Sequence, residues 1–315
     1  MDMKESARHM LKDSMQVKAG ESVLIITDDE MPSSIPESLF DAALEENAVA
    51  IILKMKAGKV PSEEPPKAVA DAMLGFDVII APTTKSISHT QARRAATEKG
   101  ARIATLPGIT ERMMTTGGIT ADYNKVAESA DKLQGMLNKT KVIRVVSKKG
   151  TDITFKVNPS KWHADTGICA KGDFINLPGG EIFIAPDDAN GTYVVDGSMG
   201  DFGILGEPIK VEVKNRYATS ITGGRADELA AMLDAKGKPG RNIAELGIGL
   251  NYNSKLIGNT LEDEKVKGTV HVALGDNSTF GGDVKAGIHI DGIIKDVEVY
   301  LDGKRIELEN FDFVD

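Results

Sequence analysis

Short apolar runs alternate with longer amphipathic segments over the first 139 residues of the chain. The runs are continuous rather than strictly alternating, which is typical of parallel strands covered on both faces. They predict four strands, at Ser22–Thr27, Val49–Lys54, Asp77–Ala81 and Arg102–Thr105. The segments around them predict helices over residues 3–16, Pro36–Glu46, Pro66–Leu74, Ser88–Lys99 and Ala121–Asn138. This order of elements predicts an α/β N-terminal domain with a parallel sheet.

The pattern changes after Lys139, where polar and apolar positions begin to alternate and glycines punctuate the strands. Lys141–Ser147 and Ile153–Val157 flank the turn-forming KKGTD and predict a hairpin. Further elements are predicted as strands at Glu181–Ala185, Thr192–Asp196, Ile209–Tyr217, Val270–Leu274, Ile288–Ile294 and Val297–Leu301, with one helix at Ala226–Ala235. The second half is therefore predicted to be a β-rich α+β C-terminal domain. We place the domains at residues 1–139 and 140–315.

Metal-ligand types of side chain stand in four apolar segments of the second half. His289 and Asp291 lie in GIHIDGI and share one face, because successive strand side chains point to opposite faces. His271 lies between valines in VHVAL, Glu181 opens EIFIAP, and Glu245 lies in AELGIGLN. Each alone is explained by a buried His–Asp hydrogen bond or by a polar residue at a strand end. Together these five residues predict one shared metal site.

The loop after the predicted strand Asp77–Ala81 is a second candidate site. It reads TTKSISHTQARRAA, and open α/β sheets bind ligands at the carboxyl ends of their strands. His89 and Thr90 are therefore candidates for substrate contact. The loop also has a local explanation, because Ser88 followed by Gln91 forms a capping-box pattern. No GxGxxG motif follows the first strand, so a dinucleotide site has no support.

Composition narrows the classes of partner. The formal net charge is −9 and no cluster of Lys and Arg is interleaved with aromatic residues, which argues against nucleic acid and anionic membrane. Cys169 is the only cysteine, so an internal disulfide is excluded and a reducing compartment is favoured. The N-terminal segment lacks a signal-peptide core, and no apolar run approaches the ~20 residues of a membrane span. We expect a cytoplasmic protein.

Five segments together resemble the M29 family of metallo-aminopeptidases, of the aminopeptidase T type. They are NLPGGEIFIAP, ELGIGLN, GTVHVALGDN, HIDGIIKD and VYLDGKRI, and the N-terminal SISHTQARRAATEKGARIATLPGIT is similar to that family as well. The resemblance implies a cytosolic homodimer with an α/β domain followed by a β-rich catalytic domain. It implies that two divalent ions, of Zn, Co or Mn, are bound by Glu181, Glu245, His271, His289 and Asp291.

The leading expectation is thus a hydrolase that releases N-terminal residues from peptides through a metal-activated water. In this reading Glu245 bridges the metals and Glu181 shuttles the proton to the leaving amine. The two glutamates favour hydrolysis, because a mononuclear iron site leaves them without a direct role.

The chain departs from the family pattern in one respect. Family peptidases carry a tyrosine shortly after the histidine that matches His271, whereas residues 274–282 read LGDNSTFGG, with Phe280 and no tyrosine. A relative of the same fold is a ring-opening pyridine-diol dioxygenase that holds one Fe(II) with two histidines and an aspartate. That set matches His271, His289 and Asp291, the facial-triad type of donor set. An Fe(II) dioxygenase acting on a small molecule, or a non-catalytic metal- or ligand-binding relative, are therefore the alternatives to the peptidase.

Overall fold

The computed structural model describes residues 1–314, and these divide into two compact units. The first contains Met1–Ala127 and Asp165–Gly179, and the second contains the remaining described residues. The chain therefore crosses between the units more than once, since residues 165–179 return to the first unit. This division concerns packing rather than independent folding, so the domain boundary predicted at residue 139/140 stays a prediction.

The first unit is built on a five-stranded sheet in which every adjacent pair of strands is parallel. Its order is β2-β1-β3-β4-β8, with bounds β1 Ser22–Asp28, β2 Val49–Met55, β3 Val78–Ala81, β4 Arg102–Thr105 and β8 Phe174–Asn176. All residues of β3 and β4 are buried, as continuous apolar runs predict for strands covered on both faces. The predicted parallel sheet is confirmed. Strand β8 was not predicted.

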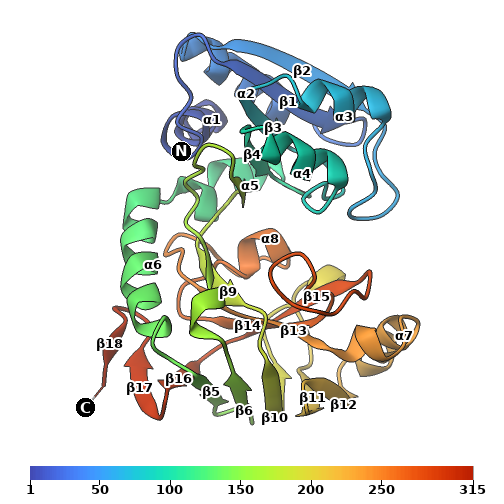
Figure 1. Ribbon diagram of the computed structural model, residues 1–315, viewed down its shortest axis with the longest axis vertical. Helices are drawn as coiled ribbons and strands as arrows, with labels where there is room; N and C mark the ends of the chain where they lie inside the picture. The colour runs from blue at the N-terminus through green and yellow to red at the C-terminus, as the bar shows by residue number, and fades with distance from the viewer. Residues whose placement is uncertain (315) are drawn as a thin grey trace. The chain divides into compact units, whose positions relative to one another are not determined.

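Helices of the first half are drawn from blue to green in Figure 1. They are α1 Met3–His9, α2 Ser34–Glu45, α3 Lys67–Met73, α4 Gln91–Glu98, α5 Glu111–Thr115 and α6 Tyr123–Leu137, with a π-helical turn at Met10–Ser14 after α1. The capping box expected at Ser88 is wrong, because Thr90 is the N-cap of α4 and its side chain accepts a hydrogen bond from the Arg93 N–H. Within residues 1–314, no helix is long and apolar enough to cross a bilayer.

The second unit contains two antiparallel sheets, and strands dominate this half of the chain in Figure 1. The larger has the order β12-β11-β10-β6-β5-β16-β17-β18, with bounds β5 Val142–Ser147, β6 Asp152–Lys156, β10 Asp188–Val195, β11 Ile209–Lys214, β12 Tyr217–Gly223, β16 Val297–Leu301, β17 Lys304–Glu307 and β18 Asp312–Phe313. This unit also contains α7 Ala226–Asp234, the short α8 Thr260–Asp263 and the part of α6 from Glu128 on. The predicted β-rich C-terminal half is confirmed.

The smaller sheet carries the predicted metal ligands. Its order is β15-β14-β13-β9-β7, with bounds β7 His163–Asp165, β9 Glu181–Ile184, β13 Ile243–Gly249, β14 Val270–Gly275 and β15 His289–Ile294. One face is apolar and buried, with Ile182, Leu246 and Val272 among its side chains. Gly292 on this face allows β15 to approach β10, because a Cβ at Gly292 would lie 2.6 Å from Val195 Cγ2. The opposite face carries the polar residues considered next.

Candidate metal centre

Five polar side chains share one face of the smaller sheet, and each faces a very small residue on a neighbouring strand. In the register, Glu181 lies opposite Gly249, His271 opposite Gly247, Glu245 and Asp291 opposite Ala273, and His289 opposite Gly275. Directly opposed residues of an antiparallel pair point to the same face. The glycines and the alanine therefore leave space over the sheet in which the five larger side chains meet.

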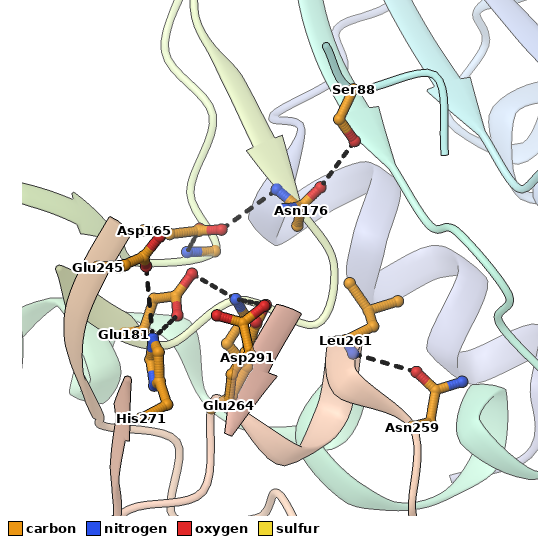
Figure 2. Close-up of polar contacts among 12 residues, drawn as sticks. Ser88, Asp165, Asn176, Glu181, Glu245, Asn259, Leu261, Glu264, His271 and Asp291 are labelled. Carbon is orange, nitrogen blue, oxygen red and sulfur yellow. Dashed lines mark hydrogen bonds and ion pairs between the residues drawn. The ribbon is translucent and has the colours of Figure 1, made fainter. Parts of the chain in front are cut away.

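The His271 ring depends on this space most directly. A Cβ built on Gly247 would lie only 1.9 Å from His271 Nε2, so the imidazole occupies the volume that any other residue would fill. The side chain of His271 is fully buried there, between the carboxylates of Glu181 and Glu245. Figure 2 shows both carboxylates directed at the ring.

The five side chains form a continuous series of close contacts. His271 Nε2 lies 3.3 Å from Glu181 Oε2 and 3.4 Å from Glu245 Oε1. The second oxygen of Glu245 lies 3.5 Å from His289 Nε2, which in turn lies 3.3 Å from Asp291 Oδ1. Glu245 thus has one oxygen near each imidazole. The structure brings all five predicted residues together.

His289 is oriented by the loop that precedes its strand. Its Nδ1 lies 2.8 Å from the Asp276 carbonyl, so Nδ1–H donates there and Nε2 is directed toward Glu245 and Asp291. The Asp276 carboxylate in turn accepts hydrogen bonds from the N–H groups of Ser278, Ala286 and Gly287, which closes the loop. An imidazole fixed through its outer nitrogen is the usual arrangement of a metal-binding histidine.

The donor atoms fit a cation better than they fit one another. Among residues 1–314, His271 Nδ1 and Nε2, Glu181 Oε2 and Asp291 Oδ1 are buried without an aligned hydrogen bond. Glu181, Glu245 and His271 supply three ligand atoms within 4.8 Å of one another, and Glu245, His289 and Asp291 supply another three. Ligands of one first-row ion lie ~2 Å from it, hence about 3–4 Å apart. The cluster has the composition and spacing of a metal-binding group.

The charges of the cluster also call for a cation. Burial lowers the pKa of His271, but contacts with Glu181 and Glu245 and the charge of these carboxylates outweigh it, so this pKa is raised well above its ordinary value. Burial likewise lowers the pKa of His289, and the charge of Asp291 raises it to about 10. The pKa of Asp291 falls to about 2 because His289 overcomes the effect of burial. The carboxylates therefore favour positive charge on both imidazoles, and a divalent ion supplies such charge.

A buried lysine adjoins the cluster. Lys265 Nζ lies 2.5 Å from Glu181 Oε1 and 2.5 Å from Glu264 Oε1, and its side chain is fully buried. Burial raises the pKa of Glu181, but the charges and contacts of Lys265 and His271 together outweigh it and lower that pKa. Burial raises the pKa of Glu264 to about 8, against the opposing charge of Lys265. Sequence reasoning missed Lys265, because a single lysine after an acidic run is ordinarily a surface residue.

A row of aromatic rings leads to the more exposed end of the cluster. His163 stacks on Phe183 at 5.3 Å between ring centroids, Phe183 meets Phe280 edge to face at 5.6 Å, and Phe280 meets His289 at 5.8 Å. The side chain of His289 is 31% exposed, whereas the other four members of the cluster are at most 9% exposed. The cluster is therefore most open beside Phe280.

These features define a two-unit protein with a parallel α/β sheet, two antiparallel sheets and a cluster of residues fit to hold a metal ion. Residues 2–310 match the family model described as NicX, 2,5-dihydroxypyridine 5,6-dioxygenase, and the chain belongs to that family. No curated protein sequence matches the chain.

Two solved structures have a similar fold. The 2,5-dihydroxypyridine dioxygenase from Pseudomonas putida KT2440 has a TM-score of 0.84 at 20% identity, covering 99% of this chain and 96% of that one. Wild-type AmpT from Thermus thermophilus has a TM-score of 0.71 at 15% identity, covering 98% of each chain. At these identities the similarity concerns the fold alone. The M29 resemblance is thereby supported for the architecture, through AmpT, and not for the activity.

The predicted enzyme class is wrong. A metallo-aminopeptidase is a hydrolase, whereas the family that spans almost the whole chain is a dioxygenase family, as is the first of the two similar structures. The hydrolase, aminopeptidase and protease descriptions are therefore withdrawn. The bridging role of Glu245 and the proton shuttle of Glu181 belonged to peptide hydrolysis and are not carried forward. The error arose because the two glutamates were taken to favour hydrolysis over a mononuclear iron site.

Proposed function

We propose that the chain is an Fe(II)-dependent dioxygenase that opens the ring of a dihydroxypyridine. Membership of the 2,5-dihydroxypyridine 5,6-dioxygenase family over residues 2–310 carries this proposal. The cluster supports it, because His271, His289 and Asp291 are the two imidazoles and one carboxylate that a facial-triad iron site needs. His289 and Asp291 lie in one group of possible ligand atoms and His271 in the adjoining group, and the two groups share Glu245. When bound, the iron would supply the binding and activation of O2 that a spin-paired aromatic substrate cannot achieve alone.

The protein's own residues then have separate tasks. His271 and Asp291 are held in a nearly closed position over the glycine-lined face, which excludes bulk water from the donors. Glu245 lies between the two imidazoles, with one oxygen near each ring, and its negative charge favours positive charge there. His289 stands at the open end of the cluster, where a small planar substrate would approach beside Phe280. A flat heteroaromatic ring suits a row of aromatic side chains, which offers stacked and edge-on contacts.

The proposal is tested by oxygen uptake. The protein is loaded anaerobically with Fe(II) and mixed with 2,5-dihydroxypyridine in air-saturated buffer. It is expected to consume one O2 for each ring lost, and ring loss is monitored by the decrease in ring absorbance. Zn(II)-loaded protein is the control and should consume none, because zinc has no redox chemistry. If protein with a full complement of iron consumes no O2 with this or other dihydroxypyridines, the assignment is wrong and a binding role replaces it.

Substrate contact with the aromatic row gives a separate prediction. Phe280→Ala is expected to raise KM by about 2–12-fold with little change in kcat, because an aromatic contact contributes roughly 0.5–1.5 kcal/mol. Phe313→Ala is the matched control, since Phe313 lies on β18, is 51% exposed and belongs to no part of the row. Steady-state kinetics with the iron-loaded proteins decide the matter. An unchanged KM in Phe280→Ala would remove the row from the substrate site.

The small-molecule substrate follows from this proposal. The homodimer, the cytoplasmic location and the absence of a nucleic-acid or membrane partner stay predictions.

A further inference from the structure

Lys265 is a buried cation that the proposed reaction does not use. It follows α8, its side chain is fully buried, and its ammonium contacts the carboxylates of Glu181 and Glu264. Burying an ammonium group is costly unless it is paired, and here the pairing is to a member of the metal cluster. Because Oε1 of Glu181 binds Lys265, only Oε2 of that carboxylate faces His271.

The lysine is held in place by its backbone as well. The Asn251 N–H donates to the Lys265 carbonyl at 2.8 Å, which joins this segment to the residues just after β13. Gly249, in the last position of β13, allows the close approach, because a Cβ there would lie 2.1 Å from the Val266 carbonyl oxygen. The same strand carries Glu245. The positive charge of Lys265 is therefore fixed relative to the metal cluster rather than free to swing into solvent.

The cluster contains enough donors for two ions, since two groups of three share only Glu245. An ion in the group of Glu181, Glu245 and His271 would have to share the Glu181 carboxylate with the Lys265 ammonium. Like charges on one buried carboxylate repel strongly, because little water screens them. We propose that Lys265 limits the centre to one divalent ion by acting as the counter-ion of Glu181. This inference rests on the proposed function. The ligands of that ion are then the proposed triad of His271, His289 and Asp291, with Glu245 between the two imidazoles.

Metal stoichiometry tests this proposal without reference to turnover. Apo-protein is titrated with Fe(II) under anaerobic conditions and separately with Mn(II), and bound metal per chain is measured by calorimetry and elemental analysis. The parent and Lys265→Arg, which keeps the charge, are expected to bind one ion per chain. Lys265→Met, which has a similar length and no charge, is expected to bind two. A parent that binds two ions, or a folded Lys265→Met that still binds one, overturns the proposal.

Lys265→Met leaves two buried carboxylates without their cation, which lowers stability, so circular dichroism is used to check that the variant is folded. A second pair of variants tests the same proposal. Glu181→Gln is expected to bind one ion, like the parent, because Glu181 is not needed for it. The double variant Lys265→Met/Glu181→Gln is expected to return from two ions to one. If Glu181→Gln binds no ion under conditions that saturate the parent, Glu181 is a ligand and the proposal is wrong. A parent that binds one ion and consumes no O2 contradicts the proposed function while leaving this inference intact.

Discussion

Replacing His289 with alanine is expected to abolish stoichiometric iron binding and to lower the rate of O2 uptake by about a thousand-fold or more. The substitution removes a donor whose Nε2 lies between Glu245 and Asp291 and whose ring is already oriented by the Asp276 carbonyl. A bound metal contributes several kcal/mol to catalysis, and each 1.36 kcal/mol is about tenfold in rate. Iron content is measured after anaerobic loading, and the rate of O2 uptake is then measured with an oxygen electrode.

His163→Ala is the matched control for this variant. His163 belongs to the same unit, is exposed, and reaches the same neighbourhood through Phe183 and through a contact of its Nε2 with the Phe280 carbonyl at 3.1 Å. It is not a proposed ligand, so its replacement should leave the iron content at the parent's value. The fold of both variants should survive, because a metal site in a large domain adds to an existing core. Full iron content in His289→Ala at the parent's affinity would exclude His289 as a ligand.

The first half of the chain was predictable because its strands are defined by local composition. Runs such as Val78–Ala81 are wholly buried, and their continuous apolar character is visible without knowledge of their partners. Strand β8 was not predictable in the same way. Phe174–Asn176 contains three residues, and its pairing with β4 joins segments about seventy residues apart, from Ile103 to Phe174. So short a strand carries no periodic pattern, and only the completed sheet specifies it.

The clustering of the five candidate ligands was predictable because charged and imidazole side chains are conspicuous in apolar strands. The small residues that leave room for these side chains also recur at a regular spacing in the sequence, and our prediction did not use that spacing. Glu245 is followed at every second position by Gly247 and Gly249, and His271 by Ala273 and Gly275. Since alternate residues share a face, this pattern signals a strand face with one large polar group and free volume beside it.

The pairing of Glu181 with Lys265 was not predictable from the sequence. The prediction of two ions counted Glu181 as freely available, whereas the structure pairs that carboxylate with Lys265 at 2.5 Å. Eighty-four positions separate the two residues in the chain, and no local pattern links them. A count of donors does not show whether a buried cation elsewhere in the chain shares one of the carboxylates, and the proposed limit of one ion depends on that sharing.

A second large loss of metal binding is expected when the free volume over β13 is filled. Gly247→Ala is expected to lower metal affinity by about 100-fold or more, although it alters no donor atom. A Cβ at this position would lie 1.9 Å from His271 Nε2 and 2.2 Å from its Cε1, distances at which the ring must move. The ring is fully buried and strand β13 is buried along its whole length, so neither partner can shift without losing packing. Even altered outer contacts of a metal ligand cost about 10–100-fold, and displacement of the ligand itself should exceed that range.

Gly206→Ala separates this steric effect from the general effect of replacing a glycine. Gly206 is exposed, and a Cβ there meets no atom within 4 Å among the described residues. Its variant should bind metal as the parent does and unfold at the same temperature, within the experimental error of the scan. Gly247→Ala should lose metal in the same titration while keeping its secondary structure by circular dichroism. Because the three atoms nearest to the added methyl group all belong to the His271 ring, parent-like affinity in Gly247→Ala would show that the ring is not held over β13 and that His271 binds no metal from this position.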